Sequence, residues 1–122
     1  MNIAMEKKAD QTLLRVQEER LDAHNSSDLK SYILHLLENG AKRLILDLSG
    51  VRFIDSSGLG ALLSGYKNAG LRQAGFVLTG LQPRVQSMFE LTRLQRVFEI
   101  YPTVEDALAA IAEEAPHEPD RD

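Results

Sequence analysis

Hydrophobic residues along the chain fall into short apolar runs that alternate with stripes of helical spacing. Apolar runs bounded by turn residues predict strands at 3–7, 12–17, 44–48, 76–79 and 97–101. Stripes with a period of about 3.6 residues predict helices around 29–37, 59–66, 85–89 and 108–111. Residues 68–75 hold two glycines and are expected to form a loop.

Strands and helices alternate after an opening pair of strands, which predicts one α/β domain. The turn at Asp10-Gln11 joins the first two strands as a hairpin, and crossover helices join the later strands in parallel. We therefore expect a mainly parallel mixed sheet of about five strands with about four helices. Residues 1–114 form this domain, whereas 115–122, with two prolines and almost no apolar residue, are expected to be a disordered tail.

The stretch from Leu44 to Lys67 connects a buried strand to a helix that opens with small residues. Asp55 is suited to the N-cap of this helix, because its carboxylate can accept the free N–H groups of the first turn. Ser56 and Ser57 then lie at the positive end of a helix, just past a strand. A phosphate group is held most easily at such a position.

Two glycines, Gly60 and Gly65, lie inside this predicted helix, where each costs about 1 kcal/mol relative to alanine. Beside the apolar stripe, a small polar face is formed by Ser57, Ala61, Ser64 and Asn68. One interpretation is close packing of the helix on its own sheet. The other is docking of a partner protein, because small residues allow a close approach. The residues by themselves leave both interpretations open.

The composition narrows the class of protein. The chain has 122 residues, of which 43% are hydrophobic, and this is enough for one core. Its net charge of −4 argues against nucleic-acid binding, which requires a basic patch. An apolar run long enough for a membrane span, a signal-peptide core and cysteine are all absent from the sequence. These features predict a cytoplasmic domain.

The sequence offers little enzymatic chemistry. Ser56 lacks the G-x-S-x-G context of a hydrolase nucleophile, since Ile54-Asp55 precede it. The histidines, His24, His35 and His117, are scattered and match neither a catalytic triad nor a metal-ligand spacing. We therefore expect no metal, no cofactor and no catalytic activity.

The sequence IDSSGLGALL, after a strand ending in DLSGV, resembles the signature of the STAS family, the anti-sigma-factor antagonists of bacteria. The resemblance extends from about residue 12 to residue 112. The segment RLD at 20–22 is similar to the G-x-L-D segment of the family. MFEL at 88–91 through VFEIY at 97–101 is similar to its C-terminal helix-strand segment. Glu19 and Arg93 depart from the pattern, because the family often has glycine at both positions.

This resemblance implies a STAS-like domain that acts as a phosphorylation-controlled partner switch. The serine directly after the aspartate is phosphorylated in the family, and the matching residue is Ser56. The implied partners are an anti-sigma factor, which is a serine kinase with a GHKL-type ATP site, and a serine phosphatase. Binding of the unphosphorylated form to the kinase frees a sigma factor. The protein is expected to be a monomer or a weak dimer.

The resemblance also favours docking as the role of the small face. The residues expected to bind the partner are Asp22, Asp55, Ser57, Gly58, Gly60, Ala61, Ser64 and Gly65. Three alternatives remain open: a STAS switch with an output other than a sigma factor, such as secretion or motility; an accessory module of a transporter; and a serine hydrolase.

Overall fold

The structure is a computed structural model that describes residues 1–114, so the predicted tail at 115–122 lies outside the described residues. In chain order the elements are β1 (Ile3–Lys8), β2 (Gln11–Val16), β3 (Arg20–Leu21), α1 (Ser26–Glu38), β4 (Arg43–Asp47), β5 (Phe53–Ile54), α2 (Ser56–Leu71), β6 (Gly75–Thr79), α3 (Pro83–Leu91), the 3-10 helix η1 (Leu94–Arg96), β7 (Glu99–Tyr101) and α4 (Val104–Glu114).

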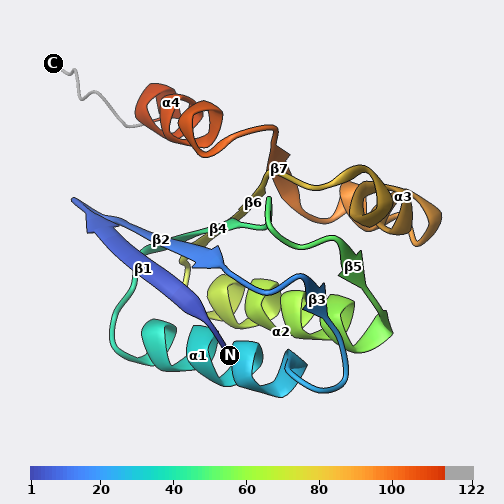
Figure 1. Ribbon diagram of the computed structural model, residues 1–122. Coiled ribbons are helices and arrows are strands. Elements are labelled where there is room, and N and C mark those ends of the chain that lie inside the picture. Colours follow the sequence, from blue (N-terminus) through green and yellow to red (C-terminus); the bar gives the residue numbers. More distant parts are fainter. Residues whose placement is uncertain (115–122) are drawn as a thin grey trace, which may run out of the picture.

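The main sheet has five strands in the order β1-β2-β4-β6-β7. β1 pairs with β2 in antiparallel register, and the other pairs are parallel. α1 and α2 lie side by side on one face of the sheet, and α4 lies on the other (Figure 1). The mainly parallel mixed sheet of a STAS-like α/β domain, with its opening hairpin, is therefore confirmed.

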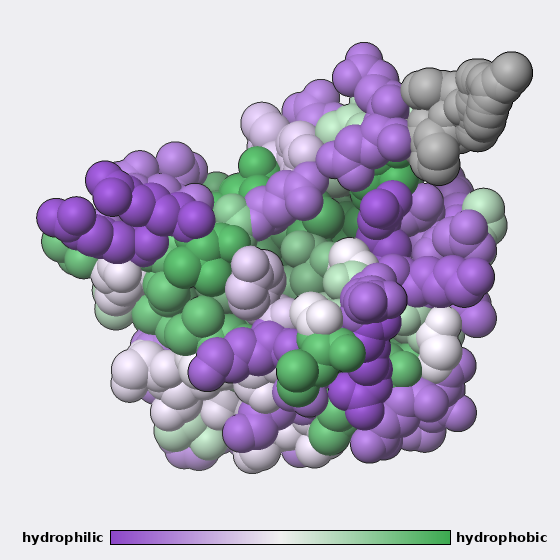
Figure 2. Space-filling model, turned by 180° about the vertical axis from the view of Figure 1, so that it is seen from behind, coloured by the Kyte–Doolittle hydropathy of each residue, from purple (hydrophilic) through white to green (hydrophobic). Residues whose placement is uncertain are grey.

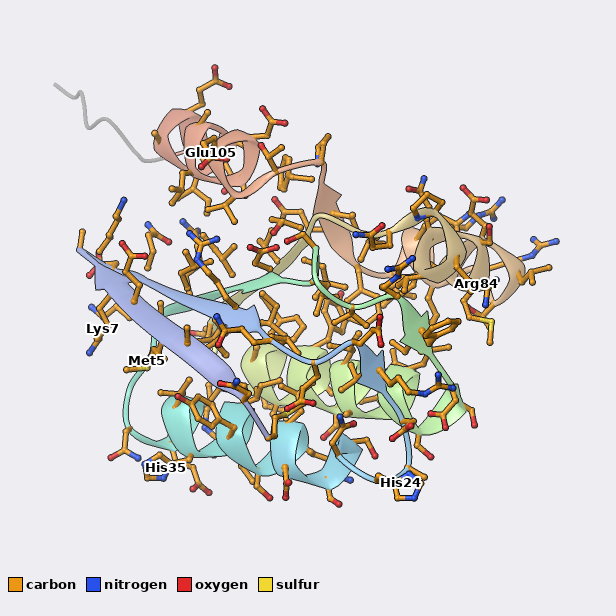
Figure 3. All side chains as sticks on the ribbon, in the orientation of Figure 1. Met5, Lys7, His24, His35, Arg84 and Glu105 are labelled. Carbon is orange, nitrogen blue, oxygen red and sulfur yellow. The ribbon has the colours of Figure 1, made fainter. Side chains whose placement is uncertain are left out.

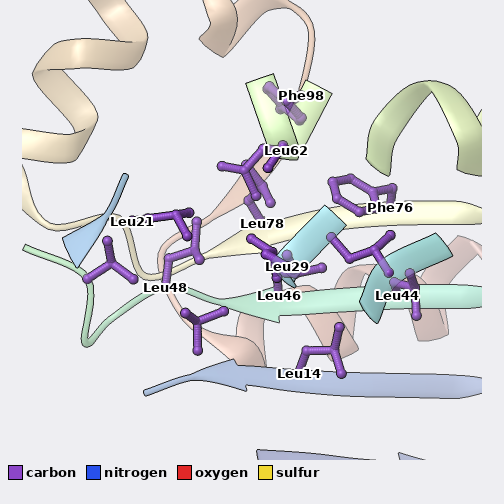
Figure 4. Packing of buried hydrophobic residues seen from close by; sticks show 14 of the residues in the cluster. Leu14, Leu21, Leu29, Leu44, Leu46, Leu48, Leu62, Phe76, Leu78 and Phe98 are labelled. Carbon is purple, nitrogen blue, oxygen red and sulfur yellow. The ribbon is translucent and has the colours of Figure 1, made fainter. Parts of the chain in front are cut away.

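The main core lies between the sheet and the pair α1 and α2. Alternate residues of the strands point into it, and α1 adds a stripe at helical spacing (Figure 4). Fully buried members of this core include Leu14, Leu29, Leu44, Leu46 and Leu78. The predicted helical stripe of α1 is thus confirmed.

A smaller core lies on the opposite face of the sheet, under α4. Leu13, Ile45 and Val77 point to this side, and Ala107 and Ile111 of α4 cover them. Because the central strands are buried on both faces, they read as continuous apolar runs rather than alternating ones.

The boundary of α2 was predicted wrongly. The helix continues to Leu71, although residues 68–75 were expected to form a loop. Ala69 is completely buried in the main core, and the side-chain amide of Asn68 donates to the backbone oxygen of Ser64 at 2.9 Å. These contacts outweigh the low helix propensity of Gly70. The helix ends where Gln73 adopts a left-handed conformation, with φ of 57°.

The expected strand at 97–101 is also shorter than predicted, because β7 begins only at Glu99. Val97 follows η1, and its backbone N–H donates to the oxygen of Leu94 at 2.9 Å. Phe98 is 5% exposed and packs among the rings of Tyr66 and other aromatic residues. Phe98 therefore anchors this turn to the core, whereas Val97 is exposed, and neither residue belongs to the strand.

The backbone conformation of two turns can be compared with the sequence predictions. The hairpin turn lies at Ala9-Asp10, one residue earlier than predicted, with Ala9 at a φ of 53°. Arg93, which stands where the family often has glycine, adopts a φ of 61°. A left-handed conformation suits glycine, so this departure strains the backbone. Glu19 is not among the described residues with positive φ, so its position does not require glycine.

Within residues 1–114, the helices are too short or too polar to cross a membrane.

Candidate functional site

Two very short strands assemble the region around Ser56. β3 and β5 pair in parallel, with Arg20 opposite Phe53 and Leu21 opposite Ile54. The pairing continues at Asp55, whose backbone N–H donates to the oxygen of Leu21 at 3.2 Å. Segments more than thirty residues apart in the sequence therefore meet immediately before α2.

Asp55 is the N-cap of α2, as its residue type predicted. Its backbone is extended, and its Oδ1 accepts a hydrogen bond from the N–H of Gly58 at 3.0 Å. Ser56 is the first residue of the helix and is exposed, whereas Ser57 is half-buried. The hydroxyl of Ser56 thus stands at a preformed helix N-terminus that solvent and a partner can reach.

Asp22 shapes the loop that leads into α1. Its Oδ1 accepts the backbone N–H of His24 at 2.9 Å, and its backbone N–H donates to the side-chain oxygen of Asn25 at 2.9 Å. Asn25, not Asp22, is the N-cap of α1. Asp22 and Asp55 line one recess, so the structure brings these two predicted site residues together.

Three residues of the expected docking face point inward, and this part of the prediction is wrong. A Cβ on Gly58 would lie 2.4 Å from the backbone oxygen of Leu21, and one on Gly65 would lie 2.9 Å from the ring of Phe76. Ala61 is only 3% exposed. Gly58, Ala61 and Gly65 are therefore small because α2 packs closely on its own domain.

The outer side of α2 carries the remaining small residues. Gly60 is exposed, and a Cβ added there would meet nothing within 4 Å. Ser57 and Ser64 are half-buried. Together with Ser56, they form an outer ridge of small residues, defined here as Ser56, Ser57, Gly60 and Ser64.

Residues 2–107 match the family model of the STAS domain. The chain belongs to the STAS domain family. It is 34% identical to the anti-sigma-B factor antagonist of Listeria monocytogenes over 81 residues, which cover 66% of this chain and 70% of that protein. It is 25% identical to the anti-sigma F factor antagonist of Paenibacillus polymyxa over 112 residues, 91% of this chain and 95% of that protein.

A solved structure supports the same assignment. The crystal structure of an anti-sigma factor antagonist from Mycobacterium paratuberculosis superposes with a TM-score of 0.82 at 28% identity. The match covers 91% of this chain and 93% of that chain. The expected family is therefore confirmed by both sequence and fold.

Sequence reasoning missed a group of residues in this STAS domain that shares a recess with Asp22 and Asp55. The guanidinium carbons of Arg20 and Arg84 lie 4.6 Å and 4.8 Å from the ring centroid of Phe53. These residues line the recess of about 290 Å³ that also contains Asp22 and Asp55. Arg84 comes from the start of α3 and is far from Phe53 in the sequence, so no local pattern could have indicated the contact.

A larger groove of about 520 Å³ lies elsewhere, between α3 and β7. It is lined partly by apolar residues, among them Leu81, Phe89 and Ile100. Figure 2 shows hydrophobic side chains gathered on this side of the molecule, next to α3. The groove does not include Ser56 or its neighbours, so it is not part of the candidate site.

The described part of this STAS domain has no group of three or more histidine, aspartate or glutamate residues placed to hold a metal ion. His24 and His35 lie apart, the first before α1 and the second within it (Figure 3). The Nδ1 atom of His24 is 3.5 Å from Asp22, but its side chain is 95% exposed. Among residues 1–114, the hydroxyl of Ser56 forms no hydrogen bond with a histidine.

Proposed function

We propose that this STAS domain is an anti-sigma-factor antagonist controlled by phosphorylation of Ser56. The unphosphorylated protein binds an anti-sigma factor, a serine kinase with a GHKL-type ATP site, and thereby frees a sigma factor. The kinase transfers a phosphoryl group from ATP to Ser56, and a serine phosphatase removes it. The protein itself acts as a binding partner and substrate rather than as an enzyme, in the cytoplasm.

The proposal is carried by one observation, which is the exposure of Ser56 at the N-terminus of a capped helix. A kinase must reach the hydroxyl group that it modifies, and Ser56 is more accessible than the half-buried Ser57. The names of the relatives, which are anti-sigma factor antagonists, support the same role.

The fold can accept a phosphate on Ser56 without rearranging. A phosphoserine carries about −1.5 to −2 charges at neutral pH. The positive end of α2 stabilises such a charge by roughly 0.3–1 kcal/mol. The carboxylate of Asp55, the preceding residue, opposes it. Because these effects act in opposite directions, we expect phosphorylation to change the stability of the domain only slightly.

The partner complex responds differently to the same phosphate. A partner that packs on the outer ridge would have to remove water from the phosphate, and this is costly unless a cation replaces the water. The outer ridge allows close contact at Gly60, because glycine has no Cβ and the space above it is open. Phosphorylation therefore weakens the contact while the domain stays folded.

A pull-down from the native host, followed by phosphopeptide mass spectrometry, tests this function. We expect a serine kinase of GHKL type to be captured and phosphate to be found on Ser56. Ser56→Ala should bind the kinase and resist modification, and Ser56→Asp should bind weakly. Phosphate on Ser57 while Ser56 is intact would contradict the assignment of the site. Capture of a secretion or motility component without a kinase would contradict the sigma-factor output.

A further inference from the structure

Phe53, in the strand just before α2, contacts two arginines. The ring is half-buried on the surface, with the guanidinium groups of Arg20 and Arg84 each less than 5 Å from its centroid. Arg20 comes from β3 and Arg84 from α3, near which Figure 3 labels it. A stacked guanidinium loses much of its rotational freedom, while the N–H groups on its edge remain free to donate.

The charge of Arg84 is not neutralised within the described part of the chain. Among residues 1–114, it forms no ion pair with a carboxylate and its side chain makes no hydrogen bond. It also lies in the first turn of α3, where the helix dipole disfavours a cation. Arg20 approaches a carboxylate only at 3.7 Å, from its Nε to Asp22. Arg84 is thus an oriented cation available to a group outside the domain, and Arg20 is a second cation whose charge is shared with Asp22.

We propose that Arg20 and Arg84, aligned by Phe53, form a docking point for carboxylate side chains on a partner protein. In so far as this partner is the anti-sigma factor, the inference rests on the function proposed above. An arginine edge matches a carboxylate with two parallel hydrogen bonds, which gives orientation as well as attraction. Asp22 and Asp55 line the same recess, and Asp22 approaches Arg20, so the free edge of Arg84 is the part of the recess most available to an incoming carboxylate.

This docking point connects the phosphorylation site to partner affinity. Ser56 directly follows Asp55, a residue of the recess. A phosphate on Ser56 adds negative charge directly after Asp55, at the margin of the recess that incoming carboxylates must approach. The phosphate repels incoming carboxylates and competes with them for the two arginines, so it opposes association of the partner.

The inference can be tested without the natural partner, using hexaglutamate peptide as the probe and NMR detection of arginine side-chain N–H signals. We expect hexaglutamate to shift the signals of Arg20 and Arg84, and Arg84→Ala to weaken binding at least threefold. Arg72→Ala is the matched control, because Arg72 is an exposed arginine at the opposite end of α2. Phe53→Leu should also weaken binding, since both arginines lose their stacking surface. Thermal melting checks that each variant is folded.

Several results would contradict the inference. Equal weakening by Arg72→Ala would mean nonspecific attraction to surface charge. Unchanged binding in Arg84→Ala would remove the docking point. Shifts of Arg20 and Arg84 with inorganic phosphate, but not with hexaglutamate, would make the recess a phosphate site instead of a carboxylate site.

The captured kinase provides a second test that separates this inference from the proposed function. Arg84→Glu should weaken kinase binding at least tenfold, while Arg72→Glu leaves it within about twofold. If the kinase binds the wild type and Arg84→Glu equally, the docking point is wrong and the proposed function stands. If the wild type binds no such kinase, the proposed function fails, and the hexaglutamate titration still decides the docking point.

Discussion

Gly58 and Gly60 lie two residues apart in α2 and should respond in opposite directions to the same substitution. At Gly60 an added Cβ meets open space, so Gly60→Ala gains only from the better helix propensity of alanine. We expect a stabilisation of about 0.5–1 kcal/mol. At Gly58 an added Cβ lies 2.4 Å from the backbone oxygen of Leu21 and 2.7 Å from the Cγ1 atom of Ile54.

The cost at Gly58 follows from what would have to move. The oxygen of Leu21 accepts the N–H of Asp55, so displacing it strains the pairing that positions the N-cap. Overpacking of this kind costs roughly 1–3 kcal/mol. Because the gain in helix propensity is common to both substitutions, the difference between the two variants measures this overpacking alone. We expect Gly58→Ala to be less stable than Gly60→Ala by about 1–3 kcal/mol.

Urea unfolding followed by circular dichroism measures both free energies of unfolding, and the slope of the transition checks that the folded state is unchanged. Equal stability of the two variants would refute the close packing of α2 against β3. It would then reopen Gly58 as a residue of the partner surface. A destabilised Gly60→Ala would show that the outer ridge is packed rather than free.

Three other changes test separate features of the structure. Ser64→Arg should change the free energy of unfolding by no more than about 0.5 kcal/mol, and it should weaken kinase binding by roughly 2 kcal/mol if Ser64 is central to the interface. Ser87→Arg, at an exposed position of α3, is the control. A loss of stability in Ser64→Arg would place Ser64 in the core instead. Arg93→Gly should raise the free energy of unfolding by up to about 1 kcal/mol in urea titrations, because glycine adopts the φ of 61° without strain; a loss would contradict this. The hydroxyl of Tyr101 donates a hydrogen bond to the Glu99 carboxylate at 2.6 Å, and this bond raises the pKa of Tyr101 to about 12. The stability that this hydrogen bond contributes is fully present below about pH 10, the pKa of an unperturbed tyrosine, and is lost as the pH rises through the folded-state pKa. The difference in ultraviolet absorbance titration between the wild type and Tyr101→Phe measures this pKa. Glu99→Ala, which removes the acceptor, should lower it, and an unchanged pKa in Glu99→Ala would exclude the hydrogen bond as the cause.

The sequence predicted those features of the fold that depend on local pattern. Parallel strands buried on both faces appear as apolar runs, and the stripe of α1 has a clear helical period. Asp55 was identified as an N-cap because capping requires only a few neighbouring residues. The end of α2 was missed, since burial of Ala69 in the tertiary core overrides two local glycines.

The candidate site was harder to predict because it depends on contacts between distant segments. The sequence could not decide whether the small residues of α2 faced a partner or the domain. The oxygen of Leu21 and the ring of Phe76 decide it for Gly58 and Gly65. The stacking of Arg84 on Phe53 depends on where α3 lies, and no spacing in the sequence encodes it.

The affinity of the partner kinase for the two forms of the protein tests the central claim most directly. The chain would be prepared with and without phosphate on Ser56, verified by mass spectrometry, and titrated against the kinase at physiological ionic strength. We expect phosphorylation to weaken binding at least tenfold, or about 1.4 kcal/mol, while the melting temperature of the free domain stays nearly constant. Equal affinities of the two forms would contradict a switch at Ser56.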